Sequence, residues 1–544
     1  MMHAQVAKYE RDRRGVGLNC ASLLIVAFLL TSRAAIAAVF NVAAGDTAGL
    51  IAAINTANGN GVANTINLAG GTYNLSAADN STVAGGANGL PVIVSTLTII
   101  GNGATIARTG APLFRLFQVG SGTPTSGTAG ALTLNDVTLT GGNPGQGGIT
   151  SSFSGAAINV LSPNSSLALN ASTITGNTAA GGGGFTVDGT SASAVVTDST
   201  IANNVASGTS GGFGGGIAVE GSSASLTLTN SAVMNNVAGT MSASIGSEGG
   251  GISVDGGGDT ITITNSTISG NQSNGGVQGA IAGGIAESGG GDVFTIAGTT
   301  ISNNSASGTS ASGVAQGGAI AAVADGNFTI LNSTISGNSA SLPAGGDPQG
   351  GGIYENGSAT FVLSNVTLTN NSARTGGGIF ESGFGSITTR NSIIAGNSAS
   401  AAGPDCSGPV TSQGHNLVGN NAGCTFASTT GDLLNVSPNL GSLADNGGAT
   451  QTHALNSGSA AIDAGDPGAP GSGGTACEAT DQRGTLRPDG PLCDIGAFEG
   501  VSTAPPPPPP TTPTKVPTLA EWALYLLSAL LAVLGARQLR RRSR

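Results

Sequence analysis

The chain has 544 residues, of which 93 are glycine, 8% are charged and 3% are aromatic, and its formal net charge at pH 7 is −11. Abundant glycine and scarce Lys and Glu argue against a long helical core, and the negative charge argues against a nucleic-acid partner, which requires a basic face. Short alternating runs of Thr, Ile and Val argue against disorder, because disordered chains are charged and poor in β-branched residues.

Residues 1–37 have the pattern of a secretory signal peptide. The basic n-region includes Arg13 and Arg14, an apolar region follows at Leu18–Leu30, and Ala35–Ala37 is a small-x-small cleavage site. An uncleaved signal anchor is the alternative, although the apolar run is short for a transmembrane helix. We therefore expect an exported protein that uses the export machinery.

Residues 38–130 are expected to form an N-terminal cap and the first coils of a repeat. Within them, "DTAGLIAAINTAN" (Asp46–Asn58) places apolar side chains at Leu50, Ile51 and Ile54 after an Asp46 N-cap. This pattern predicts a short amphipathic helix that covers the first coil.

Residues 131–411 repeat two phrases. "NSTISGN" occurs at Asn265–Asn271 and again at Asn332–Asn338, with near-copies elsewhere, and "GGGIxV" or a variant accompanies most copies. The interval between copies lies between 26 residues (Asn365 to Asn391) and 35 residues (Asn230 to Asn265). A steady period of this size indicates a solenoid or array.

One repeat predicts one coil. "GGGIxV" is a short strand entered from a glycine turn, "TITIT" (Thr260–Thr264) alternates like a half-buried strand, "NS" bends the chain and "TIS" is a third strand. The predicted fold is all-β: a right-handed parallel β-helix (β-solenoid) of about a dozen coils. A short N-terminal capping helix, a C-terminal cap, a Pro-rich linker and one C-terminal hydrophobic helix complete it.

Stacked coils place like residues above like residues, about 4.8 Å apart. The isoleucines of the repeated phrase should form one inward stack, and its opening asparagines should form a ladder of side-chain amides at a bend. The expected ladder is Asn230, Asn265, Asn332, Asn365 and Asn391. The same asparagines fit glycosylation sequons, which is the alternative interpretation.

Residues 412–500 contain "GHNLVGNNAGC", "NLGSLADNGGATQTHALNSGSAAIDAGDP" and "DQRGTLRPDGPLCDIGAFE". This region resembles the choice-of-anchor Q region of bacterial surface proteins, and the resemblance implies no catalytic residues. The cysteine spacing predicts local disulfides in an exported protein, Cys406 with Cys424 and Cys477 with Cys493. Zinc is the alternative, but a CxxC spacing is absent.

Residues 501–515 form a Pro-rich linker, and residues 516–544 combine "VPTLAEW", an apolar run (Ala523–Ala536) and a cluster of arginines. This tail resembles the IPTL-CTERM sorting signal of Gram-negative bacteria, with Val516 where that family usually has Ile. The resemblance implies a precursor held in the inner membrane through the C-terminal helix and passed outward by a sorting protease or transpeptidase. The expected sorting motif is Val516, Pro517, Thr518, Leu519, Glu521 and Trp522. A plain tail anchor is the alternative.

A rough file of acidic residues follows the glycine strands and is the candidate functional feature of the rod. The file consists of Asp188, Glu220, Asp255, Glu287, Glu355 and Glu381. Such acids could hold calcium or supply the paired carboxylates of a glycosidase. We expect instead an exposed turn whose like charges discourage edge pairing. Between Gly130 and Thr425 the only basic side chains are Arg374, Arg390 and His415, and none sits among clustered acids in the sequence.

The sequence therefore predicts an exported β-helix protein on the cell surface or outer envelope of a Gram-negative bacterium. Its expected role is non-enzymatic: contact, adhesion to extracellular glycans or other cells, or envelope structure. No catalytic residue, no metal and no cofactor is predicted, apart from possible calcium in the acidic file. The alternative is a polysaccharide-binding or polysaccharide-cleaving enzyme, a lyase or a glycosidase.

Overall fold

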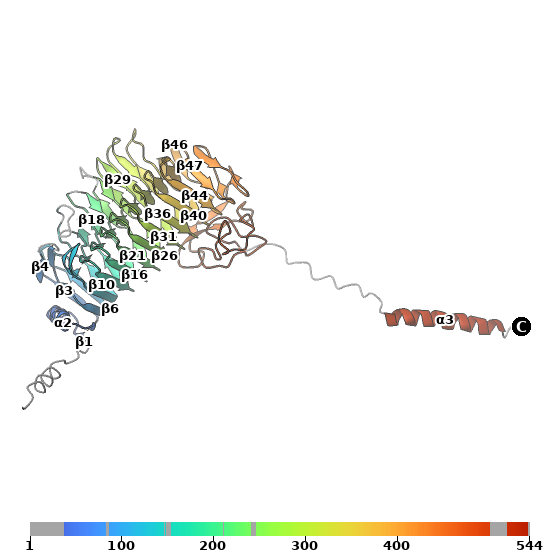
Figure 1. The fold of residues 1–544 in the computed structure, drawn as a ribbon, viewed down its shortest axis with the longest axis horizontal. Helices are drawn as coiled ribbons and strands as arrows, with labels where there is room; N and C mark the ends of the chain where they lie inside the picture. The colour runs from blue at the N-terminus through green and yellow to red at the C-terminus, as the bar shows by residue number, and fades with distance from the viewer. Residues whose placement is uncertain are drawn as a thin grey trace, which may run out of the picture. The chain divides into compact units, whose positions relative to one another are not determined.

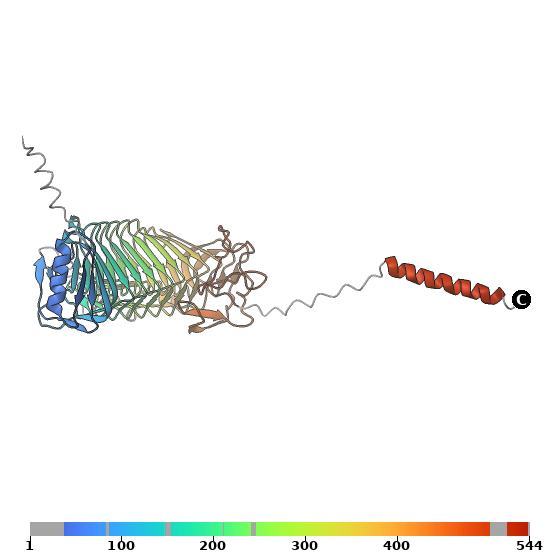
Figure 2. The same ribbon diagram turned by 90° about the horizontal axis from the view of Figure 1, so that it is seen from below.

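The computed structural model describes residues 37–82, 86–145, 147, 154–209, 211–240, 246–500 and 519–541. It divides into two compact units, one up to Gly500 and one from Val501. The first unit is a parallel β-helix whose short strands stack coil upon coil (Figures 1 and 2). The second contains one helix, α3 (Leu519–Arg541). Residues 1–36 of the predicted signal peptide and the Pro-rich linker lie outside the described residues.

Three columns of strands form the body of the rod, and parallel pairing joins each strand to its counterpart in the next coil. The glycine sheet contains β7 (Phe117–Val119), β11 (Ile158–Val160), β15 (Phe185–Val187), β20 (Ile217–Val219), β25 (Ile252–Val254), β30 (Ile285–Glu287), β35 (Ile320–Ala322), β39 (Ile353–Glu355) and β43 (Ile379–Glu381). The long sheet contains β1 (Val39–Val42), β2 (Asn64–Leu68), β6 (Thr96–Arg108), β10 (Ala131–Thr140), β12 (Ser166–Asn170), β16 (Ser193–Thr197), β21 (Ser225–Thr229), β26 (Thr260–Thr264), β31 (Val293–Ala297), β36 (Asn327–Leu331), β40 (Thr360–Ser364), β44 (Ser386–Arg390), β47 (Cys406–Ser412) and β49 (Cys424–Ala427). The short sheet continues the ends of β6 and β10 and contains β3 (Thr72–Leu75), β13 (Thr173–Thr175), β17 (Thr200–Ala202), β22 (Ala232–Met234), β27 (Thr267–Ser269), β32 (Thr300–Ser302), β37 (Thr334–Ser336), β41 (Thr367–Thr369), β45 (Ile393–Ile394), β48 (Leu417–Val418) and β50 (Leu433–Leu434).

Each coil is richer than the three strands that the sequence predicts. A fourth column follows the short sheet: β14 (Thr178–Ala179), β18 (Val205–Ala206), β23 (Val237–Gly239), β28 (Gln272–Asn274), β33 (Ser305–Ser307), β38 (Ser339–Ser341), β42 (Ser372–Thr375) and β46 (Ser398–Ala402). Middle coils add a fifth: β19 (Gly212–Phe213), β24 (Ser247–Glu248), β29 (Gly279–Ile281) and β34 (Val314–Gln316). Three hairpins lie outside the columns: β4 (Asn80–Thr82) with β5 (Gly86–Asn88), β8 (Ser121–Thr123) with β9 (Ser126–Thr128), and β51 (Leu440–Ala444) with β52 (Thr452–Leu455). The extra strands are short and polar, so alternation of apolar residues does not reveal them.

The core is the inside of the rod. The predicted stack of isoleucines is confirmed, because their strands pair in register and all five side chains are fully buried: Ile174, Ile201, Ile268, Ile301 and Ile335. Beside it, Phe294, Phe328 and Phe361 stack with centroids 4.1 and 4.3 Å apart. At the first coils the predicted helix is present as α2 (Thr47–Gly59), with Asp46 Oδ1 accepting from Gly49 N–H at 2.8 Å.

The opening residue of the repeated phrase forms a left-handed corner. Asn230, Asn265, Asn332, Asn365 and Asn391 occupy equivalent places in successive coils, with φ between 43° and 51°. Asn tolerates this conformation better than most residues, and glycine takes its place at Gly298. The asparagine at this position therefore serves the backbone.

The ladder of amides predicted for these asparagines is wrong. Asn332 Nδ2 donates to Thr480 O at 2.8 Å, and Asn391 Nδ2 donates to Thr475 O at 2.8 Å. Asn365 bonds to the same C-terminal segment, and Asn230 reaches Asp198 across an exposed corner. An αL corner directs these amides outward, where later parts of the chain use them.

The buried ladder is formed by the closing asparagine of the phrase. It runs through Asn177, Asn204, Asn236, Asn271, Asn304, Asn338, Asn371 and Asn397. Each Nδ2 donates to the next Oδ1 at 2.9–3.0 Å, and each Oδ1 also accepts the backbone N–H of the preceding ladder asparagine, as Asn371 does from Asn338. The last donor, Asn397 Nδ2, ends on the carboxylate of Asp405 at 2.9 Å. All amides point the same way, so each polarises the next, and a charged acceptor completes the chain.

Residues 435–500 cover the side of the rod, whereas the sequence placed a cap at its end. Gln482 donates to Thr300 Oγ1 at 2.9 Å and accepts from Thr334 Oγ1 at 2.6 Å. These two threonines are buried, whereas Thr173 and Thr267, which hold the equivalent position in uncovered coils, are partly exposed. Sequence separations of 148 and 182 residues explain why periodicity does not reveal this contact.

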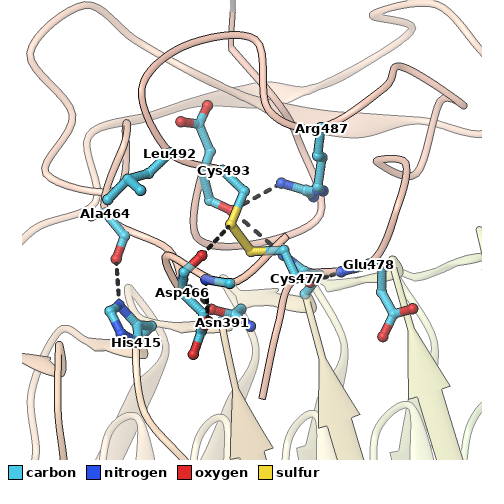
Figure 3. The surroundings of a disulfide bond; sticks show 12 residues. Asn391, His415, Ala464, Asp466, Cys477, Glu478, Arg487, Leu492 and Cys493 are labelled. Atoms are coloured by element: carbon cyan, nitrogen blue, oxygen red, sulfur yellow. Dashed lines mark hydrogen bonds between the residues drawn. A yellow bond between two sulfur atoms is a disulfide. The ribbon is translucent and has the colours of Figure 1, made fainter. Parts of the chain in front are cut away.

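Both predicted disulfides are present. The Cα atoms of Cys406 and Cys424 lie 5.1 Å apart, and those of Cys477 and Cys493 lie 6.6 Å apart. The second bridge ties two loops together above the coils, where Asp466 N–H also bonds to Asn391 Oδ1 at 2.9 Å (Figure 3). The first bridge joins two paired strands of the long sheet, β47 and β49, and the second closes the segment that has the least regular secondary structure.

Candidate functional site: the acidic corner

The acidic residues that the sequence placed in one file form two separate columns along the rod. They do not lie on an exposed turn, so that expectation is wrong. Asp188, Glu287, Glu355 and Glu381 are buried, and Glu220 and Asp255 are half-buried. The split follows from register. Glu287 pairs with Val254, whereas Asp255 comes one residue later in its own coil. Because alternate residues of a strand face opposite sides, a one-residue offset sends the side chain to the other side.

The later column, Glu287, Glu355 and Glu381, points into the rod and serves its turns. Glu355 Oε1 accepts from Gly357 N–H and Glu381 Oε1 from Gly383 N–H, both at 2.9 Å. Burial raises the pKa of Glu287 to about 8. Burial, followed by repulsion from Glu381, raises the pKa of Glu355 to about 7. These carboxyls satisfy buried backbone donors, a structural role.

The earlier column forms a mixed cluster with one residue that sequence reasoning missed. Glu248 of β24 lies in the fifth column of strands, beside Asp255 of the glycine sheet. Ser288 Oγ lies 3.1 Å from Glu248 Oε2 and is also within hydrogen-bond distance of Asp255 Oδ1, so its single hydrogen is shared between the two carboxyls. We call the group of Asp188, Glu220, Glu248 and Asp255 the acidic corner. Glu248 escaped notice because it precedes "GGGISV" instead of following it.

The acids of the corner perturb one another. Burial, and then the charge of Asp255, raises the pKa of Glu248 to about 7, and Ser288 opposes the shift. Burial and the charges of Asp188 and Asp255 raise the pKa of Glu220. Desolvation favours the neutral acid and a like charge adds to it. The corner can therefore hold protons near neutral pH, as a general acid requires.

Arg115 brings a basic group to the corner. It is fully buried, and burial lowers its pKa to about 9 while the charge of Asp188 opposes that shift. The sequence search covered Gly130 to Thr425 and so passed over it. Only the pairing of β7 with β11, and of β11 with β15, brings Arg115 and Asp188 together.

Other local features of the rod bear on ligands. Three surface cavities of about 290, 310 and 360 Å³ lie at residues 339–348, between Asn265 and residues 480–484, and around Asn58, and acids of the corner line none of the three. Among the residues that the structure describes, no three His, Cys, Asp or Glu side chains converge in an arrangement that could hold a metal ion.

Part of the sorting motif lies among the described residues of the second unit. Leu519, Glu521 and Trp522 open α3, and Trp522 is 57% exposed, whereas Val516, Pro517 and Thr518 lie outside the described residues. In the described part of the chain, no helix has both the length and the apolar character to cross a membrane. The predicted transmembrane helix is therefore not confirmed.

Two family models match this chain. The IPTL-CTERM motif matches residues 516–542, and the right handed beta helix region matches residues 250–439. No curated protein and no solved structure matches. The resemblance of residues 412–500 to a choice-of-anchor Q region stays a prediction. The sorting motif implies recognition by a sorting machinery. The chain is thus an exported, cell-surface protein that combines a right-handed parallel β-helix with a C-terminal sorting signal.

Proposed function

We propose that the β-helix makes non-enzymatic contacts at the bacterial surface, with extracellular glycans or with other cells. The observation that carries this proposal is that several carboxyls of the predicted acidic file bind the backbone of the rod itself. Glu355 and Glu381 bind backbone N–H groups of turns, and Glu287 Oε2 accepts from Ala324 N–H at 3.3 Å. Half of the predicted acidic file thus builds the rod, and a neutral surface of Ser, Thr and Asn side chains is left for contact.

The sorting route that we propose is that of a Gram-negative envelope. The C-terminal helix holds the precursor at the inner membrane, with the arginines on the cytoplasmic side, and a sorting enzyme then passes the rod outward. Support comes from the apolar surface of α3, where Leu524 is 72% and Leu526 is 70% exposed. Deletion of residues 516–544 should release a folded rod. The intact mass of the surface form of the wild type should correspond to a chain that has lost Trp522 and the residues after it. A surface form that still ends at Arg544 would contradict processing.

A second candidate function is glycoside hydrolysis at the acidic corner. One serine hydroxyl bonds to both Glu248 and Asp255, so the two carboxyls lie within about 6 Å of each other, two hydrogen-bond lengths. Retaining glycosidases place their two carboxyls about 5–5.5 Å apart. In this candidate, Glu248 is the acid and Asp255 the nucleophile.

A polysaccharide panel separates the two functions. The full-length protein is incubated with each polysaccharide in calcium and in chelator, and both binding and release of reducing sugar are measured. The matched variants are Glu248→Gln, Asp255→Asn and, away from the corner, Glu381→Gln. Binding without product supports the contact function. Product release that Glu248→Gln and Asp255→Asn abolish, and Glu381→Gln retains, establishes hydrolysis and overturns the non-enzymatic proposal.

A further inference from the structure

The outer face of the long sheet is a broad surface that carries almost no charge. It is formed by the outward side chains of β6, β10, β12, β16, β21, β26, β31, β36, β40 and β44, which are neighbours in the sheet. Figure 1 labels these strands, all but β12, along the rod. In the five-residue strands the inward positions are buried and the outward ones are exposed or half-exposed, as in β26, whose Ile261 and Ile263 face the core. The exception is Ser364 of β40, which is buried and donates to Glu478 Oε1 at 2.8 Å. Of the side chains of these strands that are not buried, three are charged: Arg108 at the end of β6, Asp136 at the bend of β10, and Arg390 of β44. We call this surface the threonine face.

Register aligns the hydroxyls of the threonine face. The middle outward position carries Thr98, Thr133, Thr227, Thr262, Thr295 and Thr329, and parallel pairing sets the last four directly above one another. Two exposed apolar side chains lie on the same face, Val195 at 42% and Val293 at 45%. The surface therefore offers methyl and hydroxyl groups at the strand spacing of about 4.8 Å.

The area of the threonine face matches the area that one partner contributes to a protein–protein interface. Ten strands at about 4.8 Å and five residues at about 3.3 Å give about 48 by 17 Å, or about 800 Å². This is the area that each partner contributes to a standard protein interface. The chain as a whole has a net charge of −11, so two copies repel through most surfaces. At the threonine face that repulsion is smallest.

We propose that the threonine face pairs with the threonine face of a second copy of this chain, and that this homotypic contact joins neighbouring cells. The proposal rests on the surface display and contact role proposed above, and it names the partner. Two identical faces meet about a two-fold axis, so each copy contributes the same patch. Threonine methyls and the two valines lose contact with water, while hydroxyls bond across the interface.

Charge reversal tests the pairing. The triple variant Thr227→Lys, Thr262→Lys, Thr295→Lys adds three positive charges at the middle of the face, and the corresponding Glu variant adds three negative charges. The matched control adds three lysines on the fourth column, at Gln272 and Ser305 in the coils of Thr262 and Thr295 and at Ser339 in the next coil, and these three residues pair in register there. Full-length chains are displayed on two differently labelled cell populations, and the purified chains are followed by sedimentation velocity.

We expect the wild type and the control variant to dimerise and to form mixed clusters of cells. The Lys variant and the Glu variant should each lose association, by at least roughly tenfold, because like charges meet in the interface. Lys cells mixed with Glu cells should cluster again, a result that a misfolded variant cannot produce. Far-UV circular dichroism spectra and cooperative thermal unfolding check the fold of each variant.

Three results would overturn the pairing. These are a wild-type chain that stays monomeric, a Lys variant that clusters like the wild type, and a Lys–Glu mixture that stays dispersed. A monomeric wild type that binds a neutral polysaccharide through this face would reassign the surface to a glycan. That outcome refutes the homotypic contact and leaves the proposed contact function standing, so the two failures are distinguishable.

Discussion

Truncation of one ladder asparagine should destabilise the rod far more than loss of a corner asparagine that opens another copy of the phrase. The Oδ1 atom of Asn338 accepts from the backbone N–H and from Nδ2 of Asn304, both at 2.9 Å. Its Nδ2 donates to Ile301 O at 3.0 Å and to Asn371 Oδ1 at 2.9 Å. Asn338→Ala removes these four bonds inside a fully buried column.

The magnitude follows from the groups left without a partner. Asn304 N–H and one Nδ2 hydrogen lose their acceptor, and Ile301 O loses a donor. A buried polar group left unsatisfied costs about 1–3 kcal/mol, so three such groups, each at the lower end of that range, should lower the free energy of unfolding by about 3 kcal/mol or more. Interruption of an aligned amide chain weakens the neighbouring bonds as well.

Urea unfolding followed by circular dichroism measures the loss, and Asn230→Gly is the control. Asn230 is exposed, its side chain reaches only Asp198 at 3.2 Å, and Gly298 already occupies the equivalent corner in a later coil. The control should stay within about 0.5 kcal/mol of the wild type, as surface changes usually do. If Asn338→Ala and Asn230→Gly cost the same, the ladder does not carry the stability assigned to it.

Three further predictions concern protonation, bridging and docking. The pKa of Glu287 rises from 4.5 to about 8 on folding, so between these pH values the native state keeps a proton that the unfolded chain loses. As the pH rises across that range, the free energy of unfolding should fall by up to about 1.4 kcal/mol per pH unit. Glu287→Gln should reduce this fall when urea unfolding is compared at pH 5 and pH 8. Replacement of Cys477 and Cys493 by Ser should lower the free energy of unfolding by about 3 kcal/mol. Reduction of the wild type also breaks the Cys406–Cys424 bridge and should lower it further. An unchanged unfolding midpoint in the Ser variant would show that packing alone holds the loops. Gln482→Ala should make residues 435–500 more sensitive to proteolysis while the rod stays protected. Equal protection of this segment in the variant and in the wild type would contradict the docking contact.

The sequence by itself determined the coil. Its period, the alternation in "TITIT" and the glycine turns predicted a parallel β-helix, and the isoleucine stack follows directly because repeats of near-constant length superpose like residues. The N-cap at Asp46 and both disulfides were also predictable, since their partners lie within a few residues or within one short loop. Local chemistry needs only local sequence.

Only the tertiary structure decided which asparagine of "NSTISGN" builds the ladder. Both ends of the phrase are Asn, and both recur with the same period. The opening Asn265 turns through an αL corner, whereas the closing Asn271 faces the inside, where Nδ2 meets the next Oδ1. The direction of a side chain depends on the backbone geometry of the corner, and the spacing of the repeats in the sequence does not reveal that geometry.

The candidate site depended on tertiary structure in the same way. Arg115 and Asp188 are more than seventy residues apart, and Glu248 precedes the phrase that was searched for acids. A register offset of one residue separated Glu287 from Asp255 and sent them to opposite sides of one strand column. Docking of Gln482 onto Thr300 joins an irregular segment to a repeat 182 residues earlier. Such contacts arise from the stacking of whole coils, so no window of sequence contains them.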